Sequence, residues 1–583
     1  MAVEKIWTLS VQAEAQWQSQ FPDVQPVVRQ LLWNRELRER DAIDQFLNPD
    51  YARDLHDPFL FKDMEKVVAR LTRAIENKEK IFVYGDYDAD GVTGSAILQS
   101  TLDKLGAITE VYMPHREKEG YGLNTGAVQY MATQNAKVII TNDCGISNAP
   151  EVDEANTRGM EVIVTDHHRI PEVIPKAYAI LHPLLPGENY PNKFLTGGGV
   201  AFKLAQGLIK EATPRLSDGA IKLEEGFEKW LLDLVAISTV ADVGILKGEN
   251  RTLVRYGLMV LNKTRRIGLQ QLMAAAGIKP GVLDTWSIGW QIAPRINAAG
   301  RMDHANNAFK LLSTADENEA AQLAAQLNQS NQLRQAETDR VLKEARSQIG
   351  DAENLPLIAV YHASWSAGVA GLVAGRLTDE FRKPVLVACK NEGGLIVGSA
   401  RSIDQFNIVE ALAAAREHIL KFGGHPKAAG FSVADEYAWQ HLIGALEERA
   451  RVVLHEVDVR PELFIDADIT LSQISWEMVQ AVSALEPFGE GNPRPRFLIH
   501  GVKVLGFDSV GNNGKHLRLT VTDETGKAKK MIGFNCGKWC ESLKVGDLLD
   551  VVVELGVNEW NGNREIELKI VDLRFHERGG SIF

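Results

Sequence analysis

The sequence is poor in cysteine, which excludes one large class of proteins. Four cysteines occur in 583 residues, and they are widely scattered: Cys144, Cys389, Cys536 and Cys540. A disulfide-stapled secreted fold needs more cysteines at closer spacing, so this usage indicates a reducing compartment and a cytoplasmic protein. Cys536 and Cys540 are one helical turn apart, but no further ligand residues accompany them, so we do not expect a zinc site there.

Long apolar runs and a surplus of positive charge are also missing. No stretch reaches the ~18 apolar residues that cross a bilayer, and the N-terminus has no basic patch followed by an apolar core. We therefore predict no transmembrane helix, no secretion signal and no membrane partner. The net charge of −13 argues against a protein that coats DNA through bulk electrostatics, although a local basic groove is compatible with it.

The remaining composition, 45% hydrophobic and 24% charged, is that of an ordinary globular chain. At ~150 residues per domain, the length predicts roughly three or four domains. Between residues 61 and 245, short apolar runs alternate with helix-length segments, which is typical of a parallel sheet with crossover helices. The runs are 81–83, 111–113, 138–140, 162–164 and 179–181. In such a sheet the ligand crevice lies beyond the carboxyl ends of the strands.

Acidic and imidazole side chains gather at these strand ends. One set follows the first run, one the third and one the fourth, and a last residue closes an apolar helix: Asp86, Asp88 and Asp90; Asp143; Asp166, His167 and His168; Asp242. Carboxylates so close together repel one another, and a divalent cation is the usual remedy because hard cations select oxygen ligands. The first set alone is also compatible with a solvated acidic turn. The whole constellation instead predicts a metal site, whose mixed carboxylate and imidazole ligands suit Mn²⁺ better than Mg²⁺.

Four motifs, in this order, carry a family resemblance: Asp-Tyr-Asp-Ala-Asp-Gly at 86–91, Asn-Asp-Cys-Gly at 142–145, Asp-His-His at 166–168 and Thr-Val-Ala-Asp at 239–242. The chain resembles the DHH phosphoesterase superfamily, and most closely its RecJ branch of 5′ exonucleases specific for single-stranded DNA. Further segments that match this branch are 115–124, 197–202, 294–301, 398–402 and 422–430. Two positions depart from it, since Ser366 stands where histidine is common and Gln405 where glycine often occurs.

The resemblance implies an α/β fold of several domains. A parallel-sheet DHH catalytic domain would span 61–304, and a second, DHHA1-like α/β accessory domain 351–455. Between them, 305–350 is rich in Ala, Gln, Leu and Glu at helical spacing and predicts a long helical connector. In 456–583, five short strand segments with Asn-Gly turns predict a C-terminal OB-type β-barrel. Residues 1–60 predict an N-terminal helical lead without an assigned role.

The barrel segment contains a mixture of basic and aromatic side chains that is typical of single-strand binding. These residues are Arg494, Arg496, Lys515, Arg518, Trp539, Trp560 and Arg564. Aromatic residues of a barrel are also used in its core, so each of them has this second interpretation.

The resemblance further implies a two-metal site that holds Mn²⁺, with Mg²⁺ as a possible substitute. Asp88 would bind one ion, Asp90 the other, and Asp143 would bridge them. The remaining ligands would be His167, His168 and Asp242. Asp86 and Asp166 would orient the ligands. The predicted catalytic group is Asp86, Asp166, His168 and His425.

A set of substrate-binding residues is implied in the same way: Arg116, Tyr121, Arg295, Asn297, Arg301, Ser399, Arg401, Gly423, Gly424 and His425. A forked guanidinium suits a phosphate, so Arg116 and Arg295 are candidates for the 5′ terminus, with ordinary surface salt bridges as the alternative. Arg401 would bind a flanking phosphate, and Tyr121 could stack on a base. The two glycines would admit a phosphate close to the backbone and His425 would donate to the scissile group, although a plain glycine turn also fits this motif.

The implied function is a metal-dependent 5′→3′ exonuclease that hydrolyses single-stranded DNA to 5′-mononucleotides in DNA repair and recombination. The protein would be a monomer whose partner is single-stranded DNA, and the family also implies a single-strand-binding protein and a helicase. A rival enzyme is a DHH phosphodiesterase for short oligonucleotides or cyclic dinucleotides, but a small substrate needs no barrel platform. A replication scaffold with a degenerate site is the non-enzymatic rival, and the complete set of aspartates and histidines argues against it.

Overall fold

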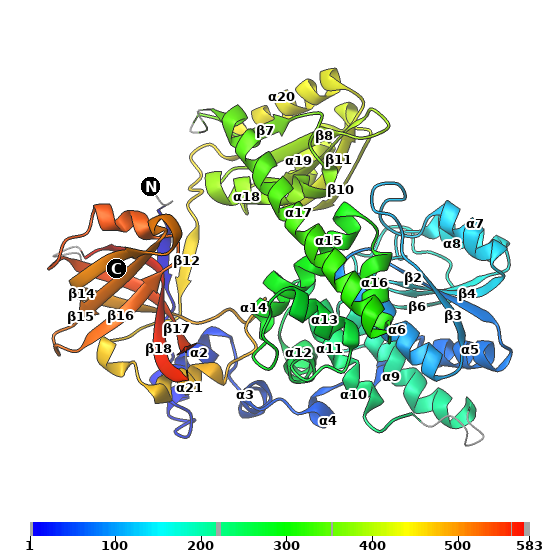
Figure 1. The fold of residues 1–583 in the computed structure, drawn as a ribbon, viewed down its shortest axis with the longest axis horizontal. Coiled ribbons are helices and arrows are strands. Elements are labelled where there is room, and N and C mark those ends of the chain that lie inside the picture. The colour runs from blue at the N-terminus through cyan, green and yellow to red at the C-terminus, as the bar shows by residue number, and fades with distance from the viewer. Residues whose placement is uncertain (1–3, 217–222, 351, 353, 561, 577–583) are drawn as a thin grey trace.

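The computed structural model describes residues 4–216, 223–350, 352, 354–560 and 562–576. Figure 1 shows three lobes: a catalytic domain coloured from blue to green, an accessory domain in yellow-green, and a β-barrel lobe in orange and red. The long helix α17 runs between the first two lobes. The structure confirms the α/β fold with a helical connector, an accessory domain and a C-terminal barrel.

Five parallel strands form the sheet of the catalytic domain, in the order β3-β2-β4-β5-β6. They are β2 (Lys80–Gly85), β3 (Ile108–Tyr112), β4 (Ala136–Asn142), β5 (Glu161–Thr165) and β6 (Ala179–Leu181). One face packs against α5 (Met64–Glu76), α6 (Ala89–Lys104), α9 (Gly197–Leu216) and α11 (Leu232–Ala241). The other face packs against α7 (Thr125–Thr133) and α8 (Ala149–Thr157). Since helices cover both faces, the central strands are apolar throughout rather than alternating.

A series of helices leads from the sheet to the accessory domain. They are α10 (Phe227–Trp230), α12 (Gly248–Leu261), α13 (Ile267–Ala275), α14 (Thr285–Ser287), the π-helical turn η2 (Ile288–Ile292), α15 (Ala293–Met302), α16 (Asn306–Ser313) and α17 (Glu317–Ile349). The 33 residues of α17, at a rise of about 1.5 Å each, make a connector of about 50 Å. In the described part of the chain, no helix is both long and apolar enough to cross a membrane.

The accessory domain is a mixed five-stranded sheet with the order β10-β11-β9-β8-β7. Its strands are β7 (Ile358–Tyr361), β8 (Val385–Lys390), β9 (Ile396–Arg401), β10 (Lys421–His425) and β11 (Ala428–Val433). Its helices are α18 (Ala367–Phe381), α19 (Ile408–Ala414) and α20 (Glu436–Val453). The Gly-Gly-His segment lies on β10, which is at the edge of this sheet beside β11.

The C-terminal strands close into a barrel, because β14 pairs with β15 on one side and with β17 on the other. The strands are β12 (Glu462–Ile465), β13 (Ala467–Asp468), β14 (Arg496–Val510), β15 (His516–Thr522), β16 (Ala528–Gly533), β17 (Leu548–Trp560) and β18 (Asn563–Phe575). Helix α21 (Trp476–Ser483) packs into the same core.

The N-terminal segment belongs to the barrel lobe, although hundreds of residues separate them in sequence. Its strand β1 (Ile6–Leu9) pairs in parallel with β12. Its helices are α1 (Ala15–Gln18), α2 (Pro26–Asn34), α3 (Arg40–Leu47) and α4 (Tyr51–Asp54). Trp17, Leu31 and Phe46 share one apolar core with Phe497 and Leu549 of the barrel. Residues 4–60 therefore contain helices and one strand, and they pack on the barrel lobe, a contact that the sequence did not indicate.

A buried arginine of α12 fastens the barrel lobe to the catalytic domain. Arg251 donates hydrogen bonds to the carbonyl oxygens of Phe46 (2.9 Å), Glu486 (2.8 Å) and Pro487 (3.3 Å). Nearby, the hydroxyl of Thr285 donates to the carbonyl of Phe488 at 2.6 Å. These bonds hold the loop before β14 against the helices that follow the acidic strand ends.

Candidate metal centre

Three neighbouring strands deliver acidic residues to one edge of the catalytic sheet. Asp86 follows β2, Asp143 follows β4 and Asp166 follows β5, and these strands are adjacent. All three side chains are buried. The structure thus brings together the acidic groups that the sequence placed at strand ends.

Two further carboxylates come from the start of α6, and hydrogen bonds fix both. Asp88 caps the helix, because its Oδ1 accepts from the backbone N–H of Asp90 at 2.9 Å. In turn, Asp90 accepts from the backbone N–H groups of Gly197 and Gly198, each at 2.7 Å, and from the hydroxyl of Ser238 at 2.5 Å. The N-terminus of α9 and Ser238 therefore fix both oxygens of Asp90 in place.

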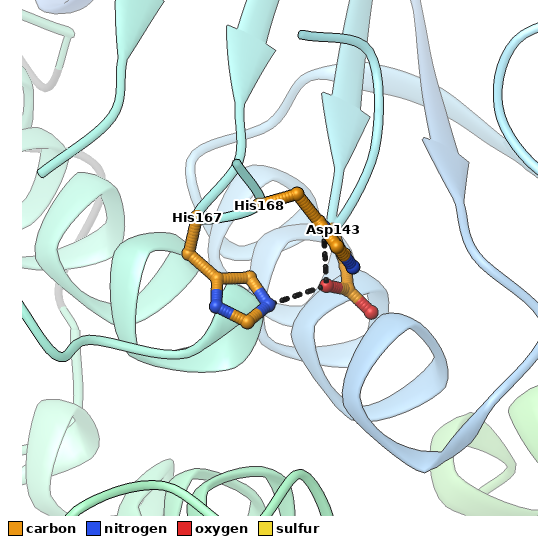
Figure 2. A group of neighbouring side chains, drawn as sticks. All are labelled: Asp143, His167 and His168. Atoms are coloured by element: carbon orange, nitrogen blue, oxygen red, sulfur yellow. Dashed lines mark hydrogen bonds and ion pairs between the residues drawn. The ribbon is translucent and has the colours of Figure 1, made fainter. Parts of the chain in front are cut away.

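His167 lies among the carboxylates. Its Nε2 is 3.0 Å from Oδ1 of Asp143, as Figure 2 shows, 3.5 Å from Oδ2 of Asp90 and 3.6 Å from Oδ2 of Asp242. Asp242 ends α11 as its C-cap residue. Only glycine allows α9 to come this close, since a Cβ on Gly197 would lie 2.6 Å from the Cβ of Asp143.

These side chains form three overlapping groups that suit divalent cations. In each group the ligand atoms lie within 4.8 Å of one another: Asp86, Asp88 and Asp143; Asp90, His167 and Asp242; Asp143, His167 and His168. Asp143 and His167 each belong to two groups, as expected if neighbouring ions share ligands. Oδ1 of Asp86 is buried, and within the described residues it has no hydrogen-bond partner. Asp86 is therefore a candidate ligand as well as the orienting group that the sequence predicts.

Burial and mutual repulsion disfavour the ionised carboxylates in the absence of a cation. Burial, followed by the charge of Asp88, raises the pKa of Asp86 well above its usual range. Burial, followed by the charges of Asp90 and Asp88, does the same to the pKa of Asp143. Burial and Asp90 also raise the pKa of Asp242 to about 8. A divalent cation would relieve this repulsion, so the carboxylates and imidazoles fit such an ion.

Metal binding should therefore strengthen as the pH rises. A carboxyl whose folded pKa is about 8 instead of 3.8, as for Asp242, makes the metal-free protein less stable as the pH rises between these values. Because the cation needs the ionised carboxylate, its binding releases protons and tightens over the same range. By calorimetry, we expect Mg²⁺ to raise Tm more at about pH 8.5 than at about pH 6. Asp242→Asn should reduce the difference, and equal Tm shifts at the two pH values in the unmodified protein would contradict this interpretation.

His168 and Asp166 form a buried pair beside this cluster. Nδ1 of His168 lies 2.8 Å from Oδ1 of Asp166. Burial alone would lower the pKa of His168, but the bond to Asp166 and its charge outweigh burial and raise this pKa to about 9. Asp166 is also buried, yet its bonds and the charge of His168 lower its pKa to about 2. Nδ1 also lies 3.8 Å from Oδ1 of Asp143, so the cluster meets this ring at Nδ1. Nε2 is the nitrogen left to meet a cation, a phosphate or a second proton.

Arginine side chains lie beside the acidic cluster. Arg301 donates to the carbonyl of Gly368 at 3.0 Å, and Arg401 donates to Oγ of Ser399 at 2.7 Å. Burial, followed by repulsion from Arg116, lowers the pKa of Arg301 to about 10 and also lowers the pKa of Arg401. Among the described residues, none of these three arginines has a carboxylate at ion-pair distance, so their donors are available to an anion.

Two other predicted substrate residues make contacts within the protein. Arg295 donates to the carbonyl of Gln291 at 2.6 Å and to Oδ1 of Asn328 at 3.0 Å, which directs it towards α17. Oδ1 of Asn297 accepts from the backbone N–H of Ala89 at 2.7 Å and so supports the first turn of α6.

Tyr121 and the Gly-Gly-His segment occupy different surroundings. The hydroxyl of Tyr121 lies 3.0 Å from Nδ1 of His168, so this tyrosine borders the acidic cluster. Gly423, Gly424 and His425 lie on the exposed edge strand β10. A Cβ on Gly423 would meet nothing within 4 Å, which leaves the backbone open to a ligand.

Sequence reasoning missed some residues that shape the site. The run Gly197-Gly198-Gly199 matched the family, but only the fold shows that its N–H groups hold Asp90. A glycine run before a long helix is a signal for such an anion-holding N-terminus.

Three family models match successive parts of the chain. The DHH family N-terminal domain matches residues 80–239, the DHHA1 domain 354–452 and the RecJ OB domain 465–572. The single-stranded-DNA-specific exonuclease RecJ of Bacillus subtilis is 36% identical over 580 residues, covering 97% of this chain and 71% of that protein. The protein of the same name from Escherichia coli is 30% identical over 577 residues, covering 94% of this chain and 96% of the relative.

The chain belongs to the RecJ family. A crystal structure of RecJ in complex with Mn²⁺ from Thermus thermophilus matches with a TM-score of 0.83 at 30% identity, covering 98% of this chain and 80% of that chain. RecJ from the same organism has also been solved with Mg²⁺, and that structure matches with a TM-score of 0.76 at 29% identity, covering 98% and 79%. With the acidic cluster described above, RecJ family membership supports a divalent-metal-dependent hydrolase of phosphodiester bonds.

The two departures from the RecJ pattern are a helix cap and an exposed residue. Ser366 caps α18, because its Oγ accepts from the backbone N–H of Gly368 at 3.2 Å. Gln405 is exposed.

Cys144, next to Asp143, is no candidate nucleophile, because burial raises the pKa of its thiol well above the usual value.

Proposed function

We propose that this protein is a 5′→3′ exonuclease that hydrolyses single-stranded DNA to 5′-mononucleotides in DNA repair and recombination. One observation carries the proposal: a groove of about 990 Å³ runs from the residues on either side of Asp242 to the barrel lobe. Its lining includes Ala241 and Val243 beside Asp242, then Arg301 and Arg401, and finally Phe488 and Arg494 of the barrel lobe. A basic groove with aromatic residues suits an extended single strand, whereas a dinucleotide would not need its length.

We further propose that the centre holds two ions, Mn²⁺ by preference and Mg²⁺ as a substitute. The residues that would hold them are Asp88, Asp90, Asp143, His167, His168 and Asp242, with Asp86 as a further candidate. When bound, such ions lower the pKa of a water molecule and offset negative charge on phosphate oxygens.

The protein's own residues would orient the metal ligands and contact the scissile phosphate. Bonds from Gly197, Gly198 and Ser238 fix Asp90, and Asp166 holds the ring of His168 through Nδ1. Where His168 does not bind an ion, its Nε2 can donate a proton or a hydrogen bond to the leaving group. Because a water molecule is the nucleophile, no covalent enzyme intermediate is needed, and His425 would close on the scissile phosphate from β10.

Digestion of end-labelled DNA tests this function. With Mn²⁺, a 5′ label on a single strand should appear at once as mononucleotide, while a 3′ label should remain on fragments that shorten gradually. Duplex DNA should resist, and a chelator should stop the reaction. Early release of the 3′ label, or equal cleavage of duplex and single strand, would contradict the proposal.

Arg116 is the first candidate for holding the 5′-terminal phosphate, together with Arg295. Arg116 is close enough to Arg301 and Arg401 to lower the pKa of both, whereas Arg295 is bonded towards α17. A charge-assisted hydrogen bond contributes about 1.5–3 kcal/mol, so Arg116→Ala should reduce the preference for a 5′-phosphorylated end by about 10- to 100-fold. Relative kcat/KM for 5′-phosphate and 5′-hydroxyl strands measures this. Arg295→Ala should have a smaller effect in the same direction, and an unchanged preference in both variants would remove them from this role.

The setting of the reaction follows from family and chemistry. We propose that the protein acts as a cytoplasmic monomer, and that a single-strand-binding protein and a helicase supply its DNA. All four cysteines are free thiols in the structure, which fits a reducing compartment.

A further inference from the structure

Two tryptophans project into the groove between the metal centre and the barrel lobe. Trp286 is 57% exposed and Trp290 is 72% exposed, and both line the groove. Tryptophan is highly buried on average, so two such side chains facing one groove indicate a binding surface.

The local structure holds these side chains outward. Trp290 lies in the π-helical turn η2, between the fully buried Ile288 and Ile292. A capping box fixes the start of α14, which holds Trp286 and leads directly into η2, because Asp284 accepts hydrogen bonds from the backbone and the hydroxyl of Ser287 at 2.9 and 2.8 Å. π-helical turns are rare and occur frequently at functional sites.

Unpaired positive charge lies in the same groove. Arg334 of α17 lines it, and the buried Nε of Arg334 has no hydrogen-bond partner within the described residues. No carboxylate of the described chain is at ion-pair distance from it, whereas Arg376, which also lines the groove, pairs with Asp339 at 2.6 Å. Burial, followed by repulsion from Arg376 and Arg295, lowers the pKa of Arg334. A forked, unpaired guanidinium beside other arginines suits a phosphate.

We propose that Trp286, Trp290 and Arg334 form a second nucleotide station, on the 3′ side of the cleaved bond. Bases would stack on the two indoles while Arg334 holds the phosphate between them. The proposal rests on the function proposed above and deepens it, because it names where the retained strand is gripped before it reaches the barrel. Stacking and phosphate contacts are independent of base identity, so the station would set a minimum strand length without sequence preference.

Substrates of different length distinguish binding at the station from the hydrolysis step. Trp290→Ala and Arg334→Ala should each raise KM for oligothymidylate of about 20 nucleotides by roughly tenfold, with kcat nearly unchanged. A strand of about two or three nucleotides does not reach the station, so its kcat/KM should stay the same. Trp290→Phe, which keeps an aromatic face, should recover most of the loss. Tyr437→Ala is the matched control, because Tyr437 is 73% exposed but lies outside the groove lining.

Direct binding provides the second measurement. In the presence of chelator, oligothymidylate should quench the tryptophan fluorescence of the unmodified protein more than that of Trp286→Phe/Trp290→Phe. Equal quenching together with an unchanged KM in Trp290→Ala would overturn the station, while the unmodified protein would still degrade single strands. If the unmodified protein degrades no single strand at all, the proposed function fails instead.

Discussion

Asp143→Asn should abolish hydrolysis while the fold remains intact. Asp143 joins two of the three ligand groups and lies 3.0 Å from His167, so its loss would disturb both ion positions. Metal ions contribute several kcal/mol of charge stabilisation in such reactions, so kcat should fall by about a thousandfold or more. Asparagine is the right substitution, because Asp143 has a φ of 61°, a left-handed conformation that asparagine tolerates and alanine disfavours. Single-turnover digestion of a 5′-labelled strand measures the loss.

The stability of the same variant distinguishes a metal ligand from a structural residue. Burial and the charge of Asp90 disfavour an ionised side chain at position 143. Asparagine carries no charge, so the Tm of the metal-free variant should stay equal or rise. The Tm increase caused by Mg²⁺ should shrink. Asp153→Asn, at an exposed position of the same domain, should change neither quantity. Retained turnover, or a metal-free Tm several degrees lower, would contradict a metal-binding role for Asp143.

Asp166→Asn should lower activity by about 10- to 100-fold, the usual cost of removing a group that orients a metal-site histidine. The variant keeps an oxygen for the backbone N–H groups of His167 and His168, but it replaces the oxygen that accepts from Ile146 with an NH2 group. It also loses the charge that raises the pKa of His168. The ring of His168 should then turn more freely and protonate less readily. The measurement is kcat as a function of Mn²⁺ concentration and pH.

The pH dependence of activity should shift in a defined direction in Asp166→Asn. With a pKa of about 9, His168 keeps its proton through neutral pH in the metal-free protein. Without Asp166 the pKa should fall, so activity that uses this proton should decline at a lower pH than in the unmodified protein. The same pH dependence and the same Mn²⁺ requirement in Asp166→Asn would contradict the orienting role of Asp166.

The sequence was sufficient to predict the catalytic sheet and the barrel, because their strands are short apolar runs or alternating segments between clear turns. It was not sufficient to place residues 1–60. The partner of β1 is β12, across most of the chain, and Trp17 and Phe46 complete the barrel core. No local pattern encodes such a long-range contact. Deleting residues 460–583 would therefore also uncover the N-terminal segment, so point variants test the barrel more cleanly.

The acidic cluster was also predictable from local sequence, because each of its motifs is a short segment that directly follows a recognisable strand or helix. What the sequence could not specify is how the motifs meet. Asp86 and Asp88 are two residues apart, yet a buried oxygen of the first has no hydrogen-bond partner among the described residues, while the second caps a helix. Arg334 carries no motif, and only the packing of α17 beside the groove makes it a candidate for phosphate binding.

Anomalous diffraction from crystals of this protein grown with Mn²⁺ tests the central claim most directly. Two manganese peaks should lie at the carboxyl ends of β2, β4 and β5, with Asp143 in contact with both. The side chains of Asp90, His167 and Asp242 should surround one of them. A single peak without Asp143, or no peak at this edge of the sheet at saturating Mn²⁺, would contradict the account.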